Sequence, residues 1–579
     1  MKFNTIDFYD NSFNEFLLLL VLIIGIGIPL YSRTGQNKVL SLYLSSNSLY
    51  QIFARNALLI SFIYFLNFYL RFEFLDIQFS ILLWISLSTL TCITKVMIKD
   101  ILRYIKSLEF KNYKSVVIYG AGSAGAQLAA QLRNSTEYKV KFFIDDSEYL
   151  LDRRIYNIPI FSPDILKKGY FKIDEILLAI PSLTINERST ILEKLSPYQI
   201  KVLQIPSIEE LSRGNKKIDS FRPVKIEDLL GRKIVRPKTS LLKNAISNGV
   251  VCVTGAGGSI GSELSRQILK LSPKKLILLE QNEFNLYSIK NQMDKLNHKK
   301  LTIITALGSA NDKNFLKKLL SFHKVNIIFH AAAYKHVPLV EENPLQGILN
   351  NVFSTKTICD VAIHLNIQKV ILISSDKAVR PTNVMGATKR LSEIIFLYYD
   401  SKKLGLTKFS MVRFGNVLGS SGSVIPLFQK QIDEGGPLTL THPKVNRYFM
   451  TIPEAAELVL QSAAISKGGE IFLLDMGKPV LIKSLAEKLI KLNGKTIIDK
   501  NNPEGDIEIV DVGLRPGEKL YEELLIDGEA SQTINPLIFK ANEKFSMLLD
   551  FEKKLDELLD AVKSQNKSKS LEILKFMVK

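Results

Sequence analysis

"GVVCVTGAGGSIGSELSRQIL", residues 249–269, is the segment from which the fold of this chain can be inferred. A run of β-branched residues leads into a glycine-rich turn, and the turn leads into a segment with helical periodicity. Gly255, Gly258 and Gly261 have the spacing T-G-x-x-G-x-x-G, which allows a tight turn and a close backbone approach. The free N–H groups of the helix that follows can hold a pyrophosphate. The pattern predicts a parallel α/β domain with a dinucleotide site.

The next predicted strand, "KLILLE" at residues 275–280, ends in an acidic residue, Glu280. A carboxylate at this place binds adenosine ribose hydroxyls and repels a 2′-phosphate. An acidic residue at the end of a strand is common and by itself indicates little. At this distance after a glycine turn, however, it indicates a ribose-binding carboxylate. The sequence therefore favours NAD over NADP as the cofactor.

A similar pattern occurs earlier in the chain. The run "SVVIYGAGSAGAQLAAQL" at residues 115–132 places Gly120, Gly122 and Gly125 between a strand and a helix. A second strand then ends at Asp145 and Asp146, and "IDEILLAIPS" at residues 173–182 reads as another strand. These features predict a Rossmann-type half. A glycine turn kept only for helix–sheet packing remains an alternative to nucleotide binding.

Composition excludes several classes of protein. A chain of 579 residues is too long for one core, so two or three domains are expected. The formal net charge of +19 is spread as lysine and not gathered in a block, so a nucleic-acid partner is not expected. Cysteines 92, 252 and 359 and the six histidines show no metal-binding spacing. We therefore expect a reducing compartment and no bound metal.

Three uncharged runs in the first hundred residues predict transmembrane helices. They are residues 16–32, the run between Arg55 and Arg71, and residues 77–94. Buried helices of a soluble protein are the alternative, and residues 38–54 can hold one weak additional helix. Basic residues in the first loop and after the third run place everything from Lys95 onward in the cytoplasm by the positive-inside rule.

These patterns divide the chain into five parts. The expected parts are a membrane anchor at 1–106, a first Rossmann-like domain at 107–205, a polar linker at 206–247, a second α/β domain at 248–540, and a basic helical C-terminal segment at 541–579. The fold class is therefore α/β, with N-terminal transmembrane helices followed by two doubly wound parallel sheets.

A series of longer motifs in the second half of the chain carries a family resemblance. They are "VNIIFHAAAYKHVPLVEENP" (325–344), "NNVFST" (350–355), "VILISSDKAVRPTNVMGATKR" (370–390), "VRFGNVLGSSGSVIPLF" (412–428), "NRYFMTIPEA" (446–455) and "LRPGEKLYEELL" (514–525). The chain resembles the membrane-anchored UDP-N-acetylglucosamine 4,6-dehydratases of bacterial polysaccharide synthesis. These are extended short-chain dehydrogenase/reductases, and the resemblance implies a smaller substrate-binding region beside the second sheet.

The resemblance also implies a reaction without net redox change. NAD⁺ takes hydride from C4 of the sugar, water leaves across C5–C6, and the hydride returns to C6, which gives a 4-keto-6-deoxy sugar nucleotide. The cofactor should stay bound because it is regenerated in each turnover. The implied partners are UDP-N-acetylglucosamine, the lipid bilayer of the bacterial inner membrane and further copies of the chain in a homo-oligomer.

The catalytic assignments centre on residues 374–389. Elimination needs a base for C5–H and an acid for the departing C6 hydroxyl, and Asp376 with Lys377 supplies such a pair. Met385 occupies the position of the family's usual tyrosine, and a thioether cannot take a proton. The base for the 4-hydroxyl therefore stays open among Asp376, an ordered water and the hydroxyls of Ser374, Ser375 and Thr388.

Binding roles come from the resemblance, residue by residue. The expected cofactor contacts are Gly255, Gly258, Ser259, Ile260, Gly261, Glu280, Ala331, Ala332, Tyr334, Asn351 and Lys389. The expected substrate contacts are Lys335, His336, Asn416, Arg447, Arg515 and Glu518. A surface salt bridge is the alternative for either arginine, and a core position is the alternative for the histidine.

The segment after the third strand of the second α/β domain departs from the family pattern. Relatives tend to have Gly-Asp after the third strand, whereas this chain has Gly308-Ser309 and so lacks an aspartate contact to adenine.

Two other functions are compatible with these motifs. A UDP-sugar 4-epimerase shares the fold and cofactor but needs no second acid/base pair. A non-catalytic membrane scaffold that binds nucleotide sugars is compatible with Met385, although the glycines and Lys389 favour an active enzyme.

Overall fold

The computed structural model describes residues 5–34, 46–70, 75–109, 113–133, 135, 137–205, 221–224, 242, 246–247, 249–297, 300–402, 405–420, 422–525, 529–543 and 548–579. Most of the predicted linker at 206–247 lies outside these residues. The chain divides into two compact units, one formed by residues 1–114 with 135–139 and the other by residues 115–134 with 140–579.

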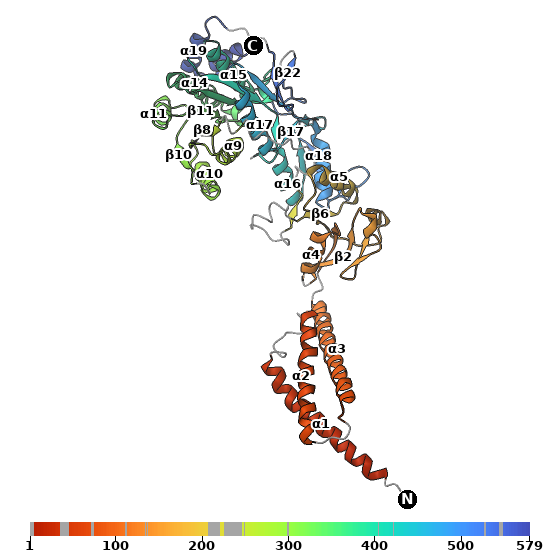
Figure 1. Ribbon diagram of the computed structural model, residues 1–579. Coiled ribbons are helices and arrows are strands. Elements are labelled where there is room, and N and C mark those ends of the chain that lie inside the picture. The colour runs from red at the N-terminus through yellow and green to blue at the C-terminus, as the bar shows by residue number, and fades with distance from the viewer. Residues whose placement is uncertain are drawn as a thin grey trace. The chain divides into compact units, whose positions relative to one another are not determined.

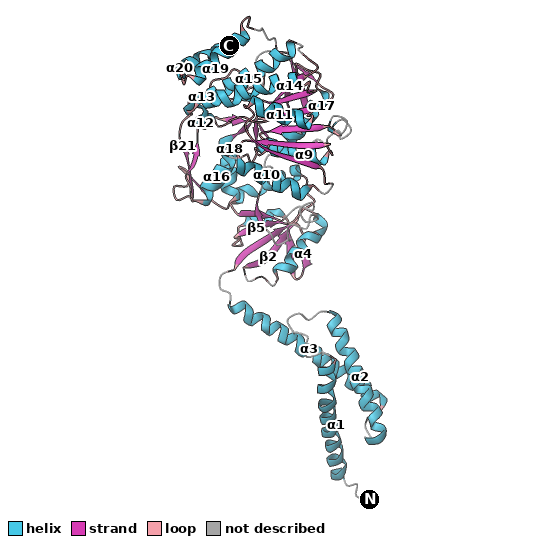
Figure 2. Ribbon diagram, turned by 90° about the vertical axis from the view of Figure 1, so that its left-hand side faces the viewer, coloured by secondary structure: helices cyan, strands magenta, loops and turns pink. Residues whose placement is uncertain are grey.

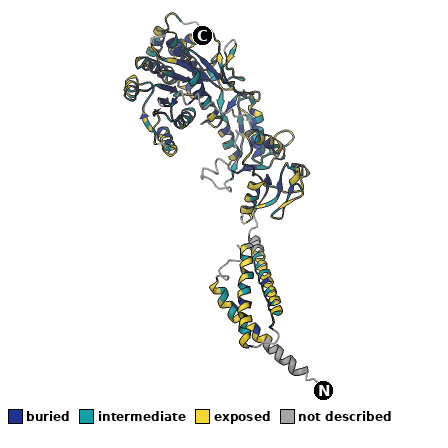
Figure 3. Cartoon of the chain, in the orientation of Figure 1, coloured by how far each residue is buried: buried dark blue, intermediate teal, exposed yellow. Residues whose placement is uncertain are grey.

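The first unit consists mainly of three long helices, α1 (Thr5–Arg33), α2 (Ser46–Leu70) and α3 (Ile77–Glu109). Each is long and apolar enough to cross a membrane, over Phe16–Arg33, Asn47–Tyr69 and Ile77–Leu102. Figure 3 shows that many residues of these helices are exposed, and the exposed ones include large apolar side chains such as Phe65 and Phe68. An apolar exterior suits a lipid environment.

Asn56 holds the three helices together through polar contacts. The side chain is fully buried, accepts a hydrogen bond from Tyr31 of α1 at 2.6 Å and donates one to Ser88 of α3 at 3.2 Å. Interhelical bonds of this kind are a common means of packing helices in lipid.

The second predicted span begins earlier than the sequence suggested. Arg55 was expected to precede it at the membrane interface, but α2 begins at Ser46 and Arg55 lies inside the helix. Residues 46–54 therefore belong to α2 and form no separate helix, while residues 38–45 lie outside the described part of the chain.

The second unit begins with a seven-stranded sheet of order β3-β4-β2-β1-β5-β6-β7. Its strands are β1 (Lys114–Tyr119), β2 (Tyr138–Ile144), β3 (Arg154–Ile155), β4 (Ile158–Phe161), β5 (Glu175–Leu178), β6 (Lys201–Gln204) and β7 (Arg222–Pro223), with helices α4 (Ser123–Leu132) and α5 (Ile185–Leu195). Strands β2 and β4, β1 and β5, and β5 and β6 pair in parallel. The first Rossmann-like sheet is thus present.

A nine-stranded sheet follows, with the order β10-β9-β8-β11-β12-β13-β18-β23-β22. Strands β8, β10, β11 and β22 of this sheet are labelled in Figure 1. Its strands are β8 (Val250–Thr254), β9 (Lys275–Glu280), β10 (Thr302–Leu307), β11 (Ile327–His330), β12 (Lys369–Ile373), β13 (Lys408–Arg413), β18 (Ile471–Leu474), β22 (Ala530–Gln532) and β23 (Ile538–Ala541). The first seven strands in this order run parallel, and β23 and β22 are antiparallel additions.

Helices cover both faces of this sheet (Figure 2). One face packs against α9 (Ser259–Lys270), α10 (Glu283–Leu296) and α17 (Ile452–Ile465), and the other against α11 (Lys313–His323), α14 (Ser354–His364) and α15 (Val384–Ser401). Alternate residues of β9 serve the two cores, because successive side chains of a strand point to opposite faces. The predicted class, N-terminal apolar helices followed by two parallel α/β sheets, is confirmed.

A smaller region lies beside the large sheet. It contains helices α16 (Val424–Asp433) and α18 (Ile482–Leu492) and three small sheets, β14 (Asn416–Val417) with β17 (Phe449–Met450), β16 (Asn446–Arg447) with β19 (Val480–Leu481), and β15 (Leu438–Leu440) with β21 (Ile507–Asp511) and β20 (Ile497–Ile498). This is the place of the predicted substrate-binding region.

The C-terminal segment forms two helices, α19 (Phe551–Lys563) and α20 (Lys567–Met577). Their apolar side chains, among them Phe551, Leu555 and Leu574, join the same core as α15 and α14. The segment expected to be a basic helical extension therefore packs against the second α/β domain.

A buried ion cluster joins α15 to the sheet. Arg413 of β13 is fully buried and donates to both carboxylate oxygens of Glu393 at 2.7 Å, and it also contacts Glu543. Arg390 of α15 lies 2.9 Å from Glu393 and 3.4 Å from Glu543. A buried charge costs several kcal/mol when its partner is removed.

Replacement of Arg413 by Met should lower the free energy of unfolding by about 3–5 kcal/mol, because it removes a buried cation that contacts the carboxylates of both Glu393 and Glu543. Urea unfolding of the purified protein, followed by circular dichroism, measures this. Lys430→Met is the control, since the Lys430–Glu434 pair is 3.7 Å long and its side chains are 71% and 60% exposed. Equal losses in the two variants would contradict the assignment of the buried cluster.

Candidate functional site

A cleft of about 940 Å³ lies where the parallel strands of the large sheet end and the smaller region begins. One wall comes from the segments after β8, β11, β12 and β13, and the other from the smaller region and from residues 515–522. The strand order reverses between β8 and β11, and α/β sheets bind ligands in the crevice at such a switch point.

The glycine turn after β8 has no room for side chains. Gly255 has a φ of +64°, and a Cβ there would lie 2.8 Å from the backbone of Ala332. A Cβ on Gly261 would lie 2.0 Å from the carbonyl oxygen of Gly255, so α9 can approach β8 only with glycine at this position. Gly258 precedes α9 and provides no side-chain cap, which leaves the N–H groups of the first turn available to a ligand.

Glu280 braces this turn. One carboxylate oxygen accepts a hydrogen bond from the Gly257 N–H at 3.0 Å, and the other accepts from the N–H groups of Gln281 and Asn282 at 3.1 Å each. A carboxylate has about four acceptor positions, so capacity remains for a ribose hydroxyl. The turn and Glu280 together therefore fit the adenosine diphosphate part of a dinucleotide.

The other predicted cofactor residues have different placements. Ser259, Ile260, Ala331, Tyr334 and Lys389 line the cleft with Gly258 and Gly261. Ala332 lies behind Gly255, and Asn351 is buried. The Asn351 amide bonds both the N–H and the C=O of Tyr334 and donates to Thr388 at 3.0 Å. Asn351 thus supports the cleft wall from behind.

Lys389 is buried and carries a perturbed amine. Its Nζ donates to the carbonyl oxygen of Ile373 at 2.6 Å. Burial lowers the pKa of Lys389 to about 8, although the nearby Glu393 acts in the opposite direction. The ammonium therefore faces the cleft at the end of β12 and lacks a carboxylate partner at hydrogen-bond distance among the described residues.

The Asp376–Lys377 pair lies directly after β12. Asp376 is buried, and its Oδ1 accepts from Ser375 Oγ at 2.7 Å and from Lys377 Nζ at 3.1 Å. Its Oδ2 is buried without a hydrogen-bond partner among the described residues. A Cβ on Gly415 would lie 3.2 Å from this oxygen, so glycine leaves it room.

Lys377 reaches across the cleft. Its Nζ lies 3.3 Å from Asn416 Oδ1 and 3.4 Å from a carboxylate oxygen of Glu522. Burial opposes the charged amine, but the carboxylates of Asp376 and Glu522 outweigh this and raise the pKa of Lys377. The pair thus combines a charged acid with a buried carboxylate.

The neighbouring hydroxyls are not equivalent. Ser374 donates to Glu393 at 2.6 Å, and Thr388 donates to the carbonyl oxygen of Met385 at 2.7 Å. Their protons are therefore engaged inside the fold, whereas Ser375 donates to Asp376 within the acid/base group. Met385 is buried and lines the cleft at the first turn of α15.

All six predicted substrate residues line the cleft, namely Lys335, His336, Asn416, Arg447, Arg515 and Glu518. Burial lowers the pKa of both Lys335 and His336, and Lys335 further lowers that of His336. Arg447 lies 3.1 Å from Glu518 and 3.8 Å from Glu522, so its salt bridges lie inside the cleft and not at the surface.

Sequence reasoning missed three charged or polar groups. Glu522 lies in the run 514–525, and Glu393 lies one helical turn after Lys389. His330 bridges Thr254 at 2.8 Å and Thr355 at 3.1 Å, and burial lowers its pKa to about 3. Only the i, i+4 spacing of Lys389 and Glu393 gave a local signal for any of them.

The first Rossmann-like sheet has a comparable turn. A Cβ on Gly120 would lie 2.4 Å from Ile180, and one on Gly125 would lie 1.9 Å from the Gly120 oxygen. The Asp145 carboxylate accepts from the Ala121 N–H at 2.7 Å. Packing alone therefore requires two of the three glycines, and nucleotide binding there stays a prediction.

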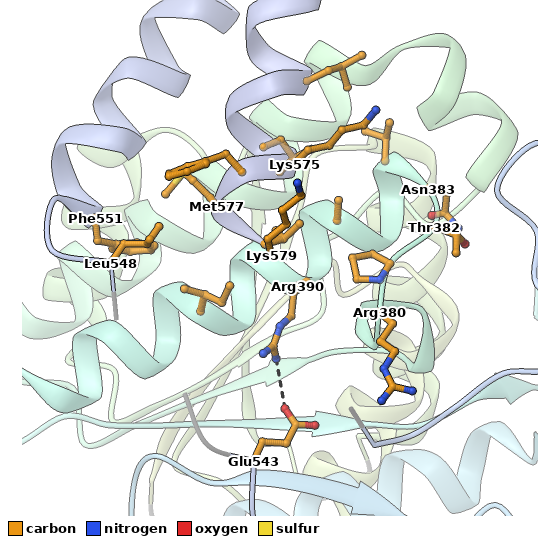
Figure 4. Close-up of a pocket in the computed structure, with 18 of the residues that line it drawn as sticks. Arg380, Thr382, Asn383, Arg390, Glu543, Leu548, Phe551, Lys575, Met577 and Lys579 are labelled. Carbon is orange, nitrogen blue, oxygen red and sulfur yellow. Dashed lines mark hydrogen bonds and ion pairs between the residues drawn. The ribbon is translucent and has the colours of Figure 1, made fainter. Parts of the chain in front are cut away.

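A second cavity of about 1140 Å³ lies between α15 and the C-terminal helices (Figure 4). Its lining includes Arg390 and Glu543 of the buried ion cluster but none of the predicted site residues. Within the described residues, no group of three or more His, Cys, Asp or Glu side chains is arranged to hold a metal ion.

Comparisons with known proteins match the same part of the chain. A family model described as "Polysaccharide biosynthesis protein" matches residues 251–543. The capsular polysaccharide biosynthesis protein CapD of Staphylococcus aureus is 41% identical over 72% of this chain and 69% of the relative. The probable polysaccharide biosynthesis protein EpsC of Bacillus subtilis is 43% identical over 71% of this chain and 68% of the relative.

Shorter relatives match the second half. A UDP-N-acetylglucosamine 4,6-dehydratase (inverting) of Campylobacter jejuni is 30% identical over 49% of this chain and 79% of the relative. A UDP-glucose 4-epimerase of Rickettsia rickettsii is 33% identical over 48% of this chain and 78% of the relative. Among solved structures, Pen from Bacillus thuringiensis is 33% identical, covers 48% of this chain and 84% of its own, and has a TM-score of 0.43.

Proposed function

The chain belongs to the polysaccharide biosynthesis protein family, and we propose that it is a membrane-anchored, NAD-dependent UDP-N-acetylglucosamine 4,6-dehydratase. The product would be a UDP-linked 4-keto-6-deoxy sugar for polysaccharide or glycan synthesis. Relatives that act in polysaccharide biosynthesis, and one relative named as such a dehydratase, support this proposal.

The Asp376–Lys377 pair carries the proposal. Elimination of water across C5–C6 needs a base and an acid on one side of the sugar, in addition to the base for the 4-hydroxyl. Asp376 Oδ1 and Lys377 Nζ are 3.1 Å apart at the end of β12, in the cleft that also contains Lys389 and the glycine turn. A pair at hydrogen-bond distance can exchange a proton and supply both functions.

The residues of the cleft fit NAD. The first turn of α9 offers free N–H groups for the pyrophosphate, and Glu280 offers acceptor capacity for the adenosine ribose. Lys389 would bind the nicotinamide ribose hydroxyls at the end of β12. When bound, NAD⁺ supplies a hydride acceptor for C4–H and the same hydride for C6. Ser309, which replaces the aspartate of relatives, accepts a hydrogen bond from the Asn311 N–H at 3.2 Å.

For the 4-hydroxyl, the geometry favours the Ser375–Asp376 group as base. Ser375 donates to Asp376 at 2.7 Å, so a proton accepted by the serine oxygen can pass to the carboxylate. This proton can continue through Lys377, 3.1 Å away, to the departing C6 hydroxyl, which leaves as water and frees Asp376 to take the C5 proton. Ser374 and Thr388 donate to internal partners. Met385 shapes the cleft beside this group and takes no part in proton transfer.

A UDP-sugar 4-epimerase is the second candidate, because epimerases are also among the relatives. An epimerase needs to abstract and return hydride at C4 only. The Ser375–Asp376 group would serve the 4-hydroxyl in either reaction, but the Lys377 acid beside Asp376 has no task in epimerisation, so the presence of the pair favours dehydration.

We place the protein in the bacterial cytoplasmic membrane, with both α/β sheets in the cytoplasm. Three helices can span the bilayer, and basic residues flank the first loop and the end of the third span. A homo-oligomer is part of the proposal by family resemblance alone.

Purified protein incubated with UDP-N-acetylglucosamine in deuterated water should form a 4-keto-6-deoxy product that NMR identifies. Asp376→Asn and Lys377→Ala should each lower turnover by about 10²–10⁴-fold, because each removes a positioned acid or base. Met385→Leu should be far milder. Near-normal rates in both acid/base variants would contradict the assignment, and formation of only a C4 epimer would favour the second candidate.

Denatured protein should release NAD⁺ or NADH, since the cofactor stays bound through turnover. Gly261→Ala should lose the nucleotide, because its Cβ would lie 2.0 Å from the Gly255 oxygen and displace α9. Gly122→Ala is the matched control, since a Cβ there meets nothing within 4 Å. Release of NADP(H) alone would overturn the role of Glu280.

Reporter fusions at Glu73 and Lys106 should report opposite sides of the membrane. Positive-inside topology places the loop between the second and third spans outside and the end of α3 inside. Alkaline phosphatase and green fluorescent protein fusions measure the two sides independently. The same side for both positions would disprove the proposed orientation.

A further inference from the structure

Glu522 is a buried carboxylate in the cleft to which neither the family resemblance nor the proposed proton transfers give a role. It lines the wall that the smaller region contributes and is 8% exposed. It comes from the segment after β21, far in sequence from the strand end that carries Asp376 and Lys377. The fold therefore brings a second carboxylate to the acid/base pair from the opposite wall.

One oxygen of Glu522 contacts two cations. Oε1 lies 3.4 Å from Lys377 Nζ and 3.8 Å from Arg447 Nε. The other oxygen is buried without a hydrogen-bond partner among the residues that the structure describes. A carboxylate that is removed from water and only partly paired costs free energy, so a functional reason for its position is expected.

We propose that Glu522 is a positioning residue for the dehydratase reaction, which holds the Lys377 ammonium beside Asp376 and ties it to Arg447. This inference rests on the proposed function. A lysine side chain is a flexible four-carbon chain with a charge at its end, and a single partner at 3.1 Å leaves it free to swing about that partner. A second carboxylate from the facing wall fixes Nζ between two points.

The second link reaches the substrate residues. Arg447 also lies 3.1 Å from Glu518, and both line the part of the cleft assigned to the substrate. Glu522 therefore connects the acid/base pair with the substrate-binding wall. A sugar bound to that wall then lies at a fixed distance from Asp376 and Lys377. A misplacement of about 1 Å in such groups can cost about 10²-fold in rate.

Among the residues that the structure describes, three charged groups act on the Lys377 ammonium. Asp376 lies on the same segment as Lys377, Glu522 on the facing segment and Arg447 on β16. The two carboxylates favour the charged Lys377 ammonium, and the Arg447 guanidinium opposes it. Removal of the Glu522 charge should therefore make Lys377 lose its proton at lower pH.

Glu522→Gln tests the proposal, because the amide keeps the shape and removes the charge. The matched control is Glu523→Gln, the next residue, whose exposed carboxylate lies 3.4 Å from Arg380. Two quantities are measured in each full-length protein. One is kcat against pH with UDP-N-acetylglucosamine, and the other is the pH dependence of Lys377 labelling by acetic anhydride, read by mass spectrometry. The Lys377 side chain is 23% exposed and thus reachable.

Glu522→Gln should lower kcat about 10- to 100-fold and move both the Lys377 labelling curve and the matching limb of the kcat profile to lower pH. Glu523→Gln should change neither. Glu522→Asp, which restores the charge, should return the labelling curve toward that of the wild type even if Glu522→Gln folds poorly. Thermal unfolding and bound NAD content show whether each variant is folded.

The inference is overturned if the wild type is active and folded Glu522→Gln has the same Lys377 labelling curve and the same kcat as the wild type. That outcome leaves the proposed function intact. A wild type that forms no keto sugar would overturn the proposed function, whereas the labelling curves would still report whether Glu522 holds Lys377.

Discussion

The carboxylate of Glu393 is the contact on which the position of α15, and with it the site, depends. It accepts hydrogen bonds from Arg413 of β13 at 2.7 Å and from Ser374 after β12 at 2.6 Å, and it lies 2.9 Å from Arg390 of its own helix. Burial by itself would raise the pKa of Glu393, but Arg413 and Arg390 outweigh it and lower the pKa to about 2. The carboxylate is therefore charged across the physiological range. Because Lys389 lies one turn earlier on the same helix, this anchor sets where its ammonium meets the cleft.

The glycine turn and the acidic strand end were predictable, because both follow from local backbone requirements. Gly255 needs a positive φ, and Gly261 meets a carbonyl oxygen at a distance that allows no side chain. The apolar spans were predictable for a similar reason, since length and absence of charge are local properties. Arg55 shows the limit, because composition alone ended the second span at a charge that the helix includes. The two parallel sheets follow from strand, turn and helix repeated in order.

The contacts that join distant segments were not predictable from one sequence. Nothing in the run 514–525 shows that Glu522 meets Lys377, since that meeting depends on how the smaller region folds over the end of the sheet. The amide of Asn351 is engaged with Tyr334 and Thr388 inside the wall, a contact that the sequence does not indicate, and its predicted contact with the cofactor stays a prediction. The C-terminal helices read as an extension, although their apolar side chains complete the core beside α15. Periodicity shows that a helix has an apolar face but not which surface that face covers.

Met385 gains a physical meaning from the two lysines that share its cleft. Lys389 donates to the carbonyl oxygen of Ile373, and burial lowers its pKa to about 8. Lys377 is largely but less completely withdrawn from water, with a side chain 23% exposed, and two carboxylates raise its pKa. Environments that shift the pKa values of two similar groups in opposite directions are typical of sites in which those groups have different acid/base roles. A phenol at position 385 would add a titrating group next to Lys389, whereas a thioether adds none. In the proposed mechanism, proton exchange would be concentrated at the end of β12, where Ser375, Asp376 and Lys377 form one hydrogen-bonded group, and Lys389 would serve in binding.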